Sequence, residues 1–197
     1  MCAIPGLSNK EWIRQTLDHK EFDYVPYNFI FMPVSAQQAI EVYGTDLNEA
    51  LDMPLRFYGP ETKKPMFVDP DEFGPTITDE FGVTWSTSKI DRGAPIGPSL
   101  KEPTLDGFTF PDPEEESRFE WIEKWCEWQK DHYRGMIVGD LWERATFMRG
   151  MENLLVDTLL NPRFVEALLN ELTDYILKGM TKLFEMDCDF ECIFLMD

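Results

Sequence analysis

Residues 136–140 of this 197-residue chain, M-I-V-G-D, indicate its fold class. It is a short apolar run that follows a glycine and ends on a carboxylate, which predicts a buried strand. A helix is expected from about Leu141 to Leu160. A second apolar run, C-I-F-L-M-D at residues 192–197, predicts another buried strand. Strand, helices and strand in this order predict a crossover connection and a parallel α/β arrangement.

A long amphipathic helix is predicted just before the second strand. Asn161 and Pro162 are typical of a helix start. The apolar residues that follow match the 3.6-residue period, at Phe164, Val165, Leu168, Leu169, Leu172, Ile176, Met180 and Leu183. Further upstream, Asp112 and Pro113 predict the start of another helix with an acidic first turn, so residues 113–197 form one zone of helices and two strands.

Residues 8–55 predict a helix, a strand and a second helix. The signals are the capping pair Ser8 and Glu11, the β-prone run V-P-Y-N-F-I-F at 25–31, the capping pair Ser35 and Gln38, and Gly44 as the end of the second helix. A serine followed three residues later by Glu or Gln is typical of a helix N-terminus. The proline in the 25–31 run is tolerated at the start of a strand.

The middle zone, residues 56–112, is rich in proline and glycine and suits neither a long helix nor a parallel sheet. Its clearest signal lies at 76–87, where apolar residues surround D-E-F-G at 79–82. This pattern predicts a two-stranded antiparallel ribbon with its turn near Gly82. The proline-rich run 92–113 is expected to be an ordered covering loop.

The composition limits the classes of partner and compartment. Lys and Arg number 18 against 37 Asp and Glu, which gives a net charge of −19. This charge argues against nucleic acid and anionic membranes as partners, because both need cationic protein faces. A small-molecule substrate is expected instead. No secretory signal or membrane span is apparent, and four cysteines without framework spacing predict reduced thiols in a cytoplasmic protein.

The number of predicted strands indicates an incomplete domain. Three runs read as strands of the parallel type, at 25–31, 136–140 and 192–197, and these are too few to close a sheet. A parallel sheet also needs cover on both faces. Residues 1–197 are therefore expected to be the front part of a larger α/β domain.

Several stretches, taken in order, resemble the N-terminal half of the uroporphyrinogen decarboxylase (URO-D)-like superfamily, which includes corrinoid-dependent methyltransferases and O-demethylases. They are W-I-R-Q-T-L at 12–17 with D-Y-V-P at 23–26, D-E-F-G-V-T-W at 79–85, the connector 100–113, G-D-L-W-E-R-A-T-F-M-R-G at 139–150, and the terminal strand 193–197. The resemblance implies the N-terminal part of a (β/α)8 TIM barrel with an inserted β-ribbon and Pro/Gly-rich loop.

Within this superfamily, two departures disfavour tetrapyrrole decarboxylation. No Arg or Lys occurs from Tyr24 to Leu55, and Phe147 stands where the decarboxylases carry a tyrosine. A substrate with many carboxylates needs guanidinium partners. The resemblance therefore favours methyl transfer between a methylated corrinoid or methoxylated compound and a thiol or folate acceptor. A non-catalytic half-barrel that binds or assists a partner is the third alternative.

The methyltransferase resemblance also concerns cofactors and partners. The zinc ligands of that branch fall in the second half of the barrel, beyond Asp197, so no metal ligand is expected in this segment. Cys188 and Cys192 lack further ligands nearby and do not make a zinc site. Zinc and a corrinoid are expected of the full-length protein, with a corrinoid protein as one partner.

The candidate site residues follow from the position of the barrel's active site at the carboxyl ends of its strands. Asp197 and Asp140 end predicted strands and are the catalytic candidates. Asp140 could instead cap the following helix, and Arg144 could pair with Glu143 or Asp140 on the surface. The candidates for substrate binding are Tyr27, Asn28, Arg144, Phe147 and Arg149.

Overall fold

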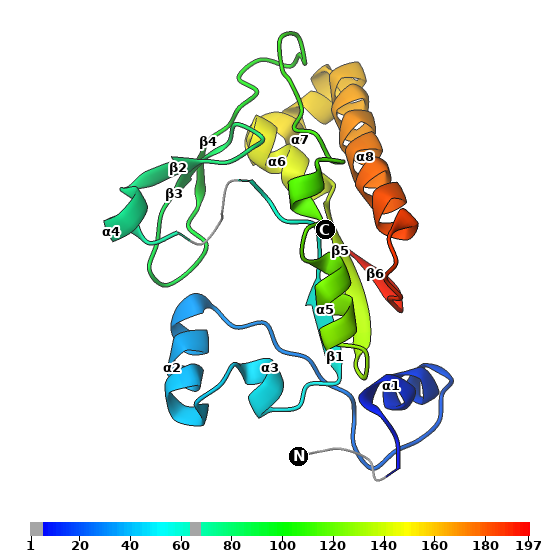
Figure 1. Ribbon diagram of the computed structural model, residues 1–197. Helices are drawn as coiled ribbons and strands as arrows, with labels where there is room; N and C mark the ends of the chain where they lie inside the picture. The colour runs from blue at the N-terminus through cyan, green and yellow to red at the C-terminus, as the bar shows by residue number, and fades with distance from the viewer. Residues whose placement is uncertain (1–5, 64–67) are drawn as a thin grey trace.

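Three parallel strands form the sheet on which the site is built. A computed structural model describes residues 6–63 and 68–197. Its strands β1 (Leu55–Tyr58), β5 (Tyr133–Asp140) and β6 (Cys192–Met196) lie in the order β1-β5-β6, and both pairs are parallel. The predicted parallel α/β arrangement and the two later strands are confirmed (Figure 1). Within the described ranges, the strands form two three-stranded sheets and no closed barrel.

The crossover from β5 to β6 contains three helices rather than the two predicted. They are α6 (Trp142–Arg149), α7 (Met151–Leu160) and α8 (Pro162–Glu185). The single helix expected over 141–160 is wrong, because Gly150 has φ 83° and ψ 130°, which no helix contains. The Met148 carbonyl at this break accepts a hydrogen bond from the Leu100 amide at 2.8 Å. The predicted start of α8 at Asn161 and Pro162 is confirmed.

The strand predicted at 25–31 is wrong. This run lies extended and pairs with no strand. Side-chain hydrogen bonds hold it in place of backbone ones. The Tyr27 hydroxyl donates to the Leu51 carbonyl at 2.6 Å, and the Asn28 side-chain amide donates to the Leu55 carbonyl at 3.1 Å. The strand that pairs with β5 on this side is β1, which was not predicted. Its buried Arg56 breaks the apolar pattern that would have marked it.

The helix boundaries of the front region are partly as predicted. The capping box of Ser8 and Glu11 begins α1 (Asn9–Leu17), as expected. Helix α2 (Pro33–Tyr43) begins at its proline without a side-chain cap, so the predicted capping pair Ser35 and Gln38 is wrong. Gly44 ends α2 in the left-handed conformation, φ 75°, as predicted. The shorter helices are α3 (Leu47–Ala50) and α4 (Pro70–Phe73).

The helix predicted to begin at Asp112 and Pro113 begins later. Only a single 3-10 turn forms at Glu116–Arg118, and α5 covers Ile122–Trp128. The physical reason is that the Arg118 side chain donates to the Asp112 carbonyl at 2.7 Å and takes the acceptor that an α-helix would use.

The predicted antiparallel ribbon is confirmed and has a third strand. Strands β2 (Thr76–Thr78) and β3 (Thr84–Ser86) pair around a turn in which Gly82 has φ 75°. Strand β4 (Pro95–Gly97) adds to β3 from within the proline-rich run that was expected to be only a loop. A three-residue edge strand leaves almost no pattern in a sequence, and proline is tolerated there.

Two apolar cores hold these parts together. One lies between the ribbon and helices α6, α7 and α8. The other packs α5 and the end of α8 on the sheet, where Ile122, Met136 and Leu183 are fully buried. A disulfide between Cys126 and Cys188 closes the second core, so the prediction of reduced thiols is wrong for this pair. Cys192 is free, and Cys2 lies outside the described residues.

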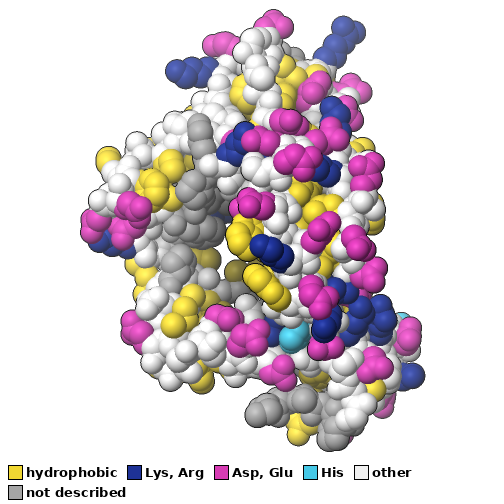
Figure 2. All heavy atoms as spheres, viewed as in Figure 1, with side chains coloured by type: hydrophobic (Ala, Val, Ile, Leu, Met, Phe, Trp, Pro, Cys, Tyr) yellow, Lys and Arg dark blue, Asp and Glu magenta, His cyan; other side chains and the backbone are white. Residues whose placement is uncertain are grey.

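The surface reflects the composition. Figure 2 shows Asp and Glu side chains spread over the visible face, with fewer Lys and Arg among them. In the described part of the chain, no helix has the length and apolar character needed to cross a bilayer.

Candidate functional site

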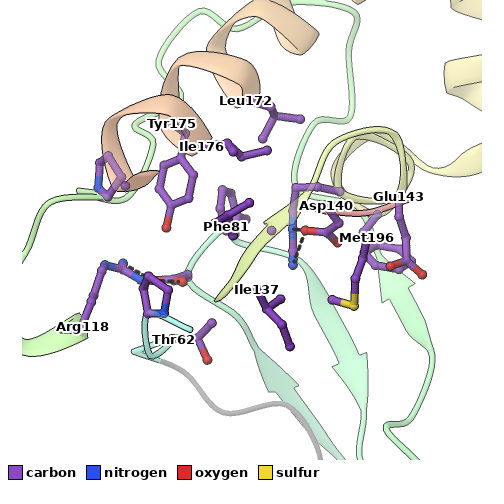
Figure 3. A pocket seen from close by; sticks show the side chains of 18 of the residues that line it. Thr62, Phe81, Arg118, Ile137, Asp140, Glu143, Leu172, Tyr175, Ile176 and Met196 are labelled. Atoms are coloured by element: carbon purple, nitrogen blue, oxygen red, sulfur yellow. Dashed lines mark hydrogen bonds and ion pairs between the residues drawn. The ribbon is translucent and has the colours of Figure 1, made fainter. Parts of the chain in front are cut away.

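A pocket of about 190 Å³ opens where strand β5 ends. Its floor is formed by residues 137–140, its wall by Leu172, Tyr175 and Ile176 of α8, and its far side by Phe81 of the ribbon (Figure 3). The strand has a bulge between Ile137 and Gly139 at this point. The pocket lies at the carboxyl ends of parallel strands, which is where α/β proteins commonly bind ligands.

Arg144 of α6 joins the strand end to the ribbon. Its guanidinium donates to Asp140 Oδ1 at 3.2 Å and to Asp79 Oδ2 at 3.3 Å, and it lies over the Phe81 ring, 4.6 Å from the centroid. The pairing with Asp140 was predicted, but the structure makes it buried rather than solvated, with the Arg144 side chain 11% exposed. Burial raises the pKa of Asp140, although Arg144 opposes the shift.

Asp197, not Asp140, caps helix α6. The backbone amides of Trp142 and Glu143 donate to Asp197 Oδ1 at 2.8 and 3.1 Å. The alternative that Asp140 caps the helix is therefore wrong, since Leu141 stands at that position without a side-chain bond. The predicted catalytic carboxylate of Asp197 touches the helix start beside the pocket, where Met196 is a lining residue.

Replacing Asp197 by alanine is expected to lower the free energy of unfolding by about 0.5–2 kcal/mol, the usual effect of losing an N-terminal cap. Asparagine at the same position should retain most of the stability. Urea unfolding monitored by circular dichroism measures this, with the exposed Asp187→Ala as control. Equal stability of Asp197→Ala and the unmodified chain would contradict the capping role.

A second buried ion pair borders the pocket. Arg118 Nη1 donates to Glu80 Oε1 at 3.1 Å, and Nη2 bonds Oε2. The Arg118 and Glu80 side chains are 3% and 7% exposed. Burial lowers the pKa of Arg118, but the hydrogen bond to Glu80 and the nearby Tyr175 and Glu115 together outweigh it, so the net shift of the pKa is upward.

The hydroxyl of Tyr175 is a polar group of the pocket that bonds no described residue. Figure 3 shows this side chain pointing from α8 into the pocket, and within the described residues its hydroxyl makes no hydrogen bond. Its ring lies edge-on to Phe81, 5.3 Å between centroids. Burial raises the pKa of Tyr175 to about 12, so the phenol is protonated and available as a donor at neutral pH.

Phe147 and two charged neighbours form the outer side of the pocket. The Phe147 ring is edge-on to Trp85 at 4.8 Å, and the Arg92 guanidinium lies 5.3 Å from the Phe147 centroid. Arg92 pairs with Glu143 at 2.9 Å. Phe147 thus lines the pocket, as its predicted role in substrate binding requires.

Three of the predicted substrate-binding residues lie elsewhere. Arg149 is 7% exposed and donates to Asp157, at 2.6 Å, and to two backbone carbonyls. It does not line the pocket, so this geometry gives no support for substrate contact. Tyr27 and Asn28 bond the backbone carbonyls of Leu51 and Leu55 and do not line the pocket.

Four pocket residues, Glu80, Arg92, Arg118 and Tyr175, were not predicted, nor was Asp79, which does not line the pocket but bonds Arg144. Both Asp79 and Glu80 belong to the ribbon motif D-E-F-G-V-T-W. The pair of acidic residues before an apolar ribbon strand was a usable signal, because consecutive carboxylates at a tight turn need partners once the turn is buried.

The charges of the pocket are balanced. Three guanidiniums, of Arg92, Arg118 and Arg144, face three carboxylates, of Glu143, Glu80 and Asp140. The remaining lining is largely apolar. Among the described residues, no three His, Cys, Asp or Glu side chains are grouped so as to hold a metal ion.

Comparison of the chain with protein-family models, with curated proteins and with solved structures gives no match.

Proposed function

We propose that this chain forms the substrate-binding part of a methyltransferase of the URO-D-like type, and that its pocket binds a small methoxylated molecule. The observation that carries the proposal is the Tyr175 hydroxyl, which bonds no described residue, in an apolar pocket at the carboxyl ends of parallel strands. In this proposal the β1-β5-β6 sheet is part of a (β/α)8 barrel, whose active site lies at that end.

A methoxylated compound matches both the polar groups and the apolar lining of the pocket. An ether oxygen accepts a hydrogen bond but carries no charge, so it suits a protonated phenol. The lining guanidiniums are already bonded to carboxylates, which leaves no unpaired charge for an ionic ligand. The Phe81 and Phe147 rings offer apolar surface to an aromatic or aliphatic body.

The same charge balance speaks against the alternative of tetrapyrrole decarboxylation. A polyanionic substrate needs free cationic donors, and each arginine of the pocket has a carboxylate partner. The volume of about 190 Å³ also lies below the roughly 300–1,000 Å³ of pockets for larger ligands.

The cofactors of the methyltransferase resemblance do not fit the described residues. These residues contain no grouped set of zinc ligands, and the pocket is too small to enclose a corrin ring. We therefore assign no chemical step to a metal or corrinoid here. A corrinoid is expected on a separate partner protein that approaches the open end of the pocket.

Binding of methoxybenzene to the full chain, measured by ligand-observed NMR, tests the proposal, with uroporphyrin as the competing class of probe. Methoxybenzene is expected to bind and uroporphyrin is not. Tight binding of uroporphyrin would favour the decarboxylase alternative. If neither probe binds, the proposal is overturned and the non-catalytic alternative is favoured.

Replacing Tyr175 by phenylalanine is expected to weaken methoxybenzene binding about 2- to 12-fold, the effect of losing one neutral hydrogen bond of about 0.5–1.5 kcal/mol. The melting temperature should not fall, because the hydroxyl bonds no described residue. Tyr43→Phe, at an exposed tyrosine of α2, is the matched control. Unchanged affinity in Tyr175→Phe would show that the hydroxyl does not contact the ligand.

A further inference from the structure

A second hollow, of about 500 Å³, lies between the extended segment 28–31, helices α2 and α3, and strand β1. We refer to it as the docking groove. Its apolar lining includes Phe29, Ile30, Phe31, Ile40 and Trp125. It is separate from the proposed substrate pocket, with which it shares only Ile137.

The segment along the groove is unusually exposed for its composition. Ile30 is 77% exposed and Phe29 54%. Within the described residues, Phe29, Ile30 and Phe31 make no backbone hydrogen bond to another part of the chain. An extended apolar segment with unpaired peptide groups is the surface to which another peptide can add as a strand.

The charge around the groove is predominantly negative. Residues 21–55 contain no Lys or Arg, and their acidic residues are Glu21, Asp23, Glu41, Asp46, Glu49 and Asp52. Over α2, Figure 2 shows apolar and acidic side chains without dark blue ones. The guanidinium of Arg56, which lines the groove, is occupied by Glu49 at 3.5 Å and by the Asn48 carbonyl.

We propose that the docking groove binds an extended peptide segment of a partner protein in which apolar and basic side chains alternate. The apolar side chains would cover Phe29, Ile30 and Ile40. The basic ones would meet Asp46 and Glu49, and the peptide backbone would pair with residues 29–31. This partner satisfies all three features at once: exposed apolar surface, unpaired peptide groups and a net negative charge, since Arg56 offsets only one of the surrounding carboxylates.

The negative charge around the docking groove also excludes other classes of partner. A second copy of this chain carries the same acidic stretch and would place like charges face to face. An anionic membrane or a nucleic acid would be repelled for the same reason. A cationic peptide is the class that the surface attracts.

A labelled synthetic peptide that alternates lysine with valine and phenylalanine tests the proposal by fluorescence anisotropy on the full chain. It is expected to bind, and added salt should weaken the binding. The same peptide with glutamate in place of lysine should not bind. Ile30→Lys should weaken binding about tenfold or more, since it removes apolar contact and adds a like charge. Leu159→Lys, at an equally exposed residue of α7, is the matched control.

Hydrogen exchange on the unmodified chain gives a second measurement that needs no variant. The bound peptide should slow exchange of the Phe29, Ile30 and Phe31 amides. The proposal is overturned if the glutamate peptide binds equally well, if both lysine variants lose affinity alike, or if protection appears away from residues 28–32. It is also overturned if sedimentation shows a dimer without peptide that Ile30→Lys dissociates, because the occupant is then a second copy.

Discussion

Replacing Arg118 by methionine is expected to lower the free energy of unfolding by about 3–5 kcal/mol, because the Glu80 carboxylate would remain buried without its partner. Glu80 is 7% exposed on its side chain. Arg118 also donates to the backbone carbonyls of Glu61 and Asp112, which would lose their donor. Urea unfolding of the full chain measures the loss.

The double variant Arg118→Met with Glu80→Gln separates the two contributions. The double variant has no unpaired buried charge, so its free energy of unfolding should be clearly higher than that of Arg118→Met alone. The free energy of unfolding of Arg118→Met could instead lie within about 1 kcal/mol of that of the unmodified chain, well below the cost expected for an unpaired buried charge. The Arg118–Glu80 pair would then not be the buried link between the ribbon turn and the 112–118 segment.

Replacing Arg149 by methionine is expected to destabilise the chain by a similar amount, about 3–5 kcal/mol, for a related reason. Its guanidinium bonds Asp157 at 2.6 Å and the Leu100 and Lys101 carbonyls at 3.1 and 2.6 Å. These bonds hold α6, α7 and the proline-rich connector together. Thermal and urea unfolding measure the effect, with the exposed Arg163→Met as matched control.

The same Arg149 variant decides between a structural and a ligand-binding role. At temperatures where it remains folded, its affinity for methoxybenzene should equal that of the unmodified chain, since Arg149 does not line the pocket. A loss of affinity without a loss of stability would restore the substrate-binding role that the sequence suggested.

The features predicted correctly from the sequence are those with local causes. The capping box at Ser8, the start of α8 at Pro162 and the turn at Gly82 each depend on groups within a few residues. The parallel sheet followed from the order of apolar runs, because a strand–helix–strand connection permits few topologies. The candidates Asp140 and Arg144 were found for the same reason, since they lie at or just beyond a predicted strand end, whereas Phe147 came from the family resemblance.

The features predicted wrongly depend on distant partners. The run 25–31 has high β-propensity, but no strand pairs with it. Strand β1 was not predicted because Arg56 interrupts its apolar pattern. This arginine can be buried only because acceptors from elsewhere in the chain, including Gln129 and the Asn48 carbonyl, surround it. The helix break at Gly150 and the late start of α5 likewise involve bonds from Leu100 and Arg118 that no local pattern announces.

The amino-acid order by itself therefore determined the helix caps, the ribbon turn and the direction of the strands, because backbone preferences and short-range hydrogen bonds act within a few residues. Which distant charges are paired, which strand borders β5 and which side chains meet in the pocket depend on the tertiary structure. Glu80, Arg118 and Tyr175 are far apart in the chain, and only packing removes enough water to make their placement matter energetically.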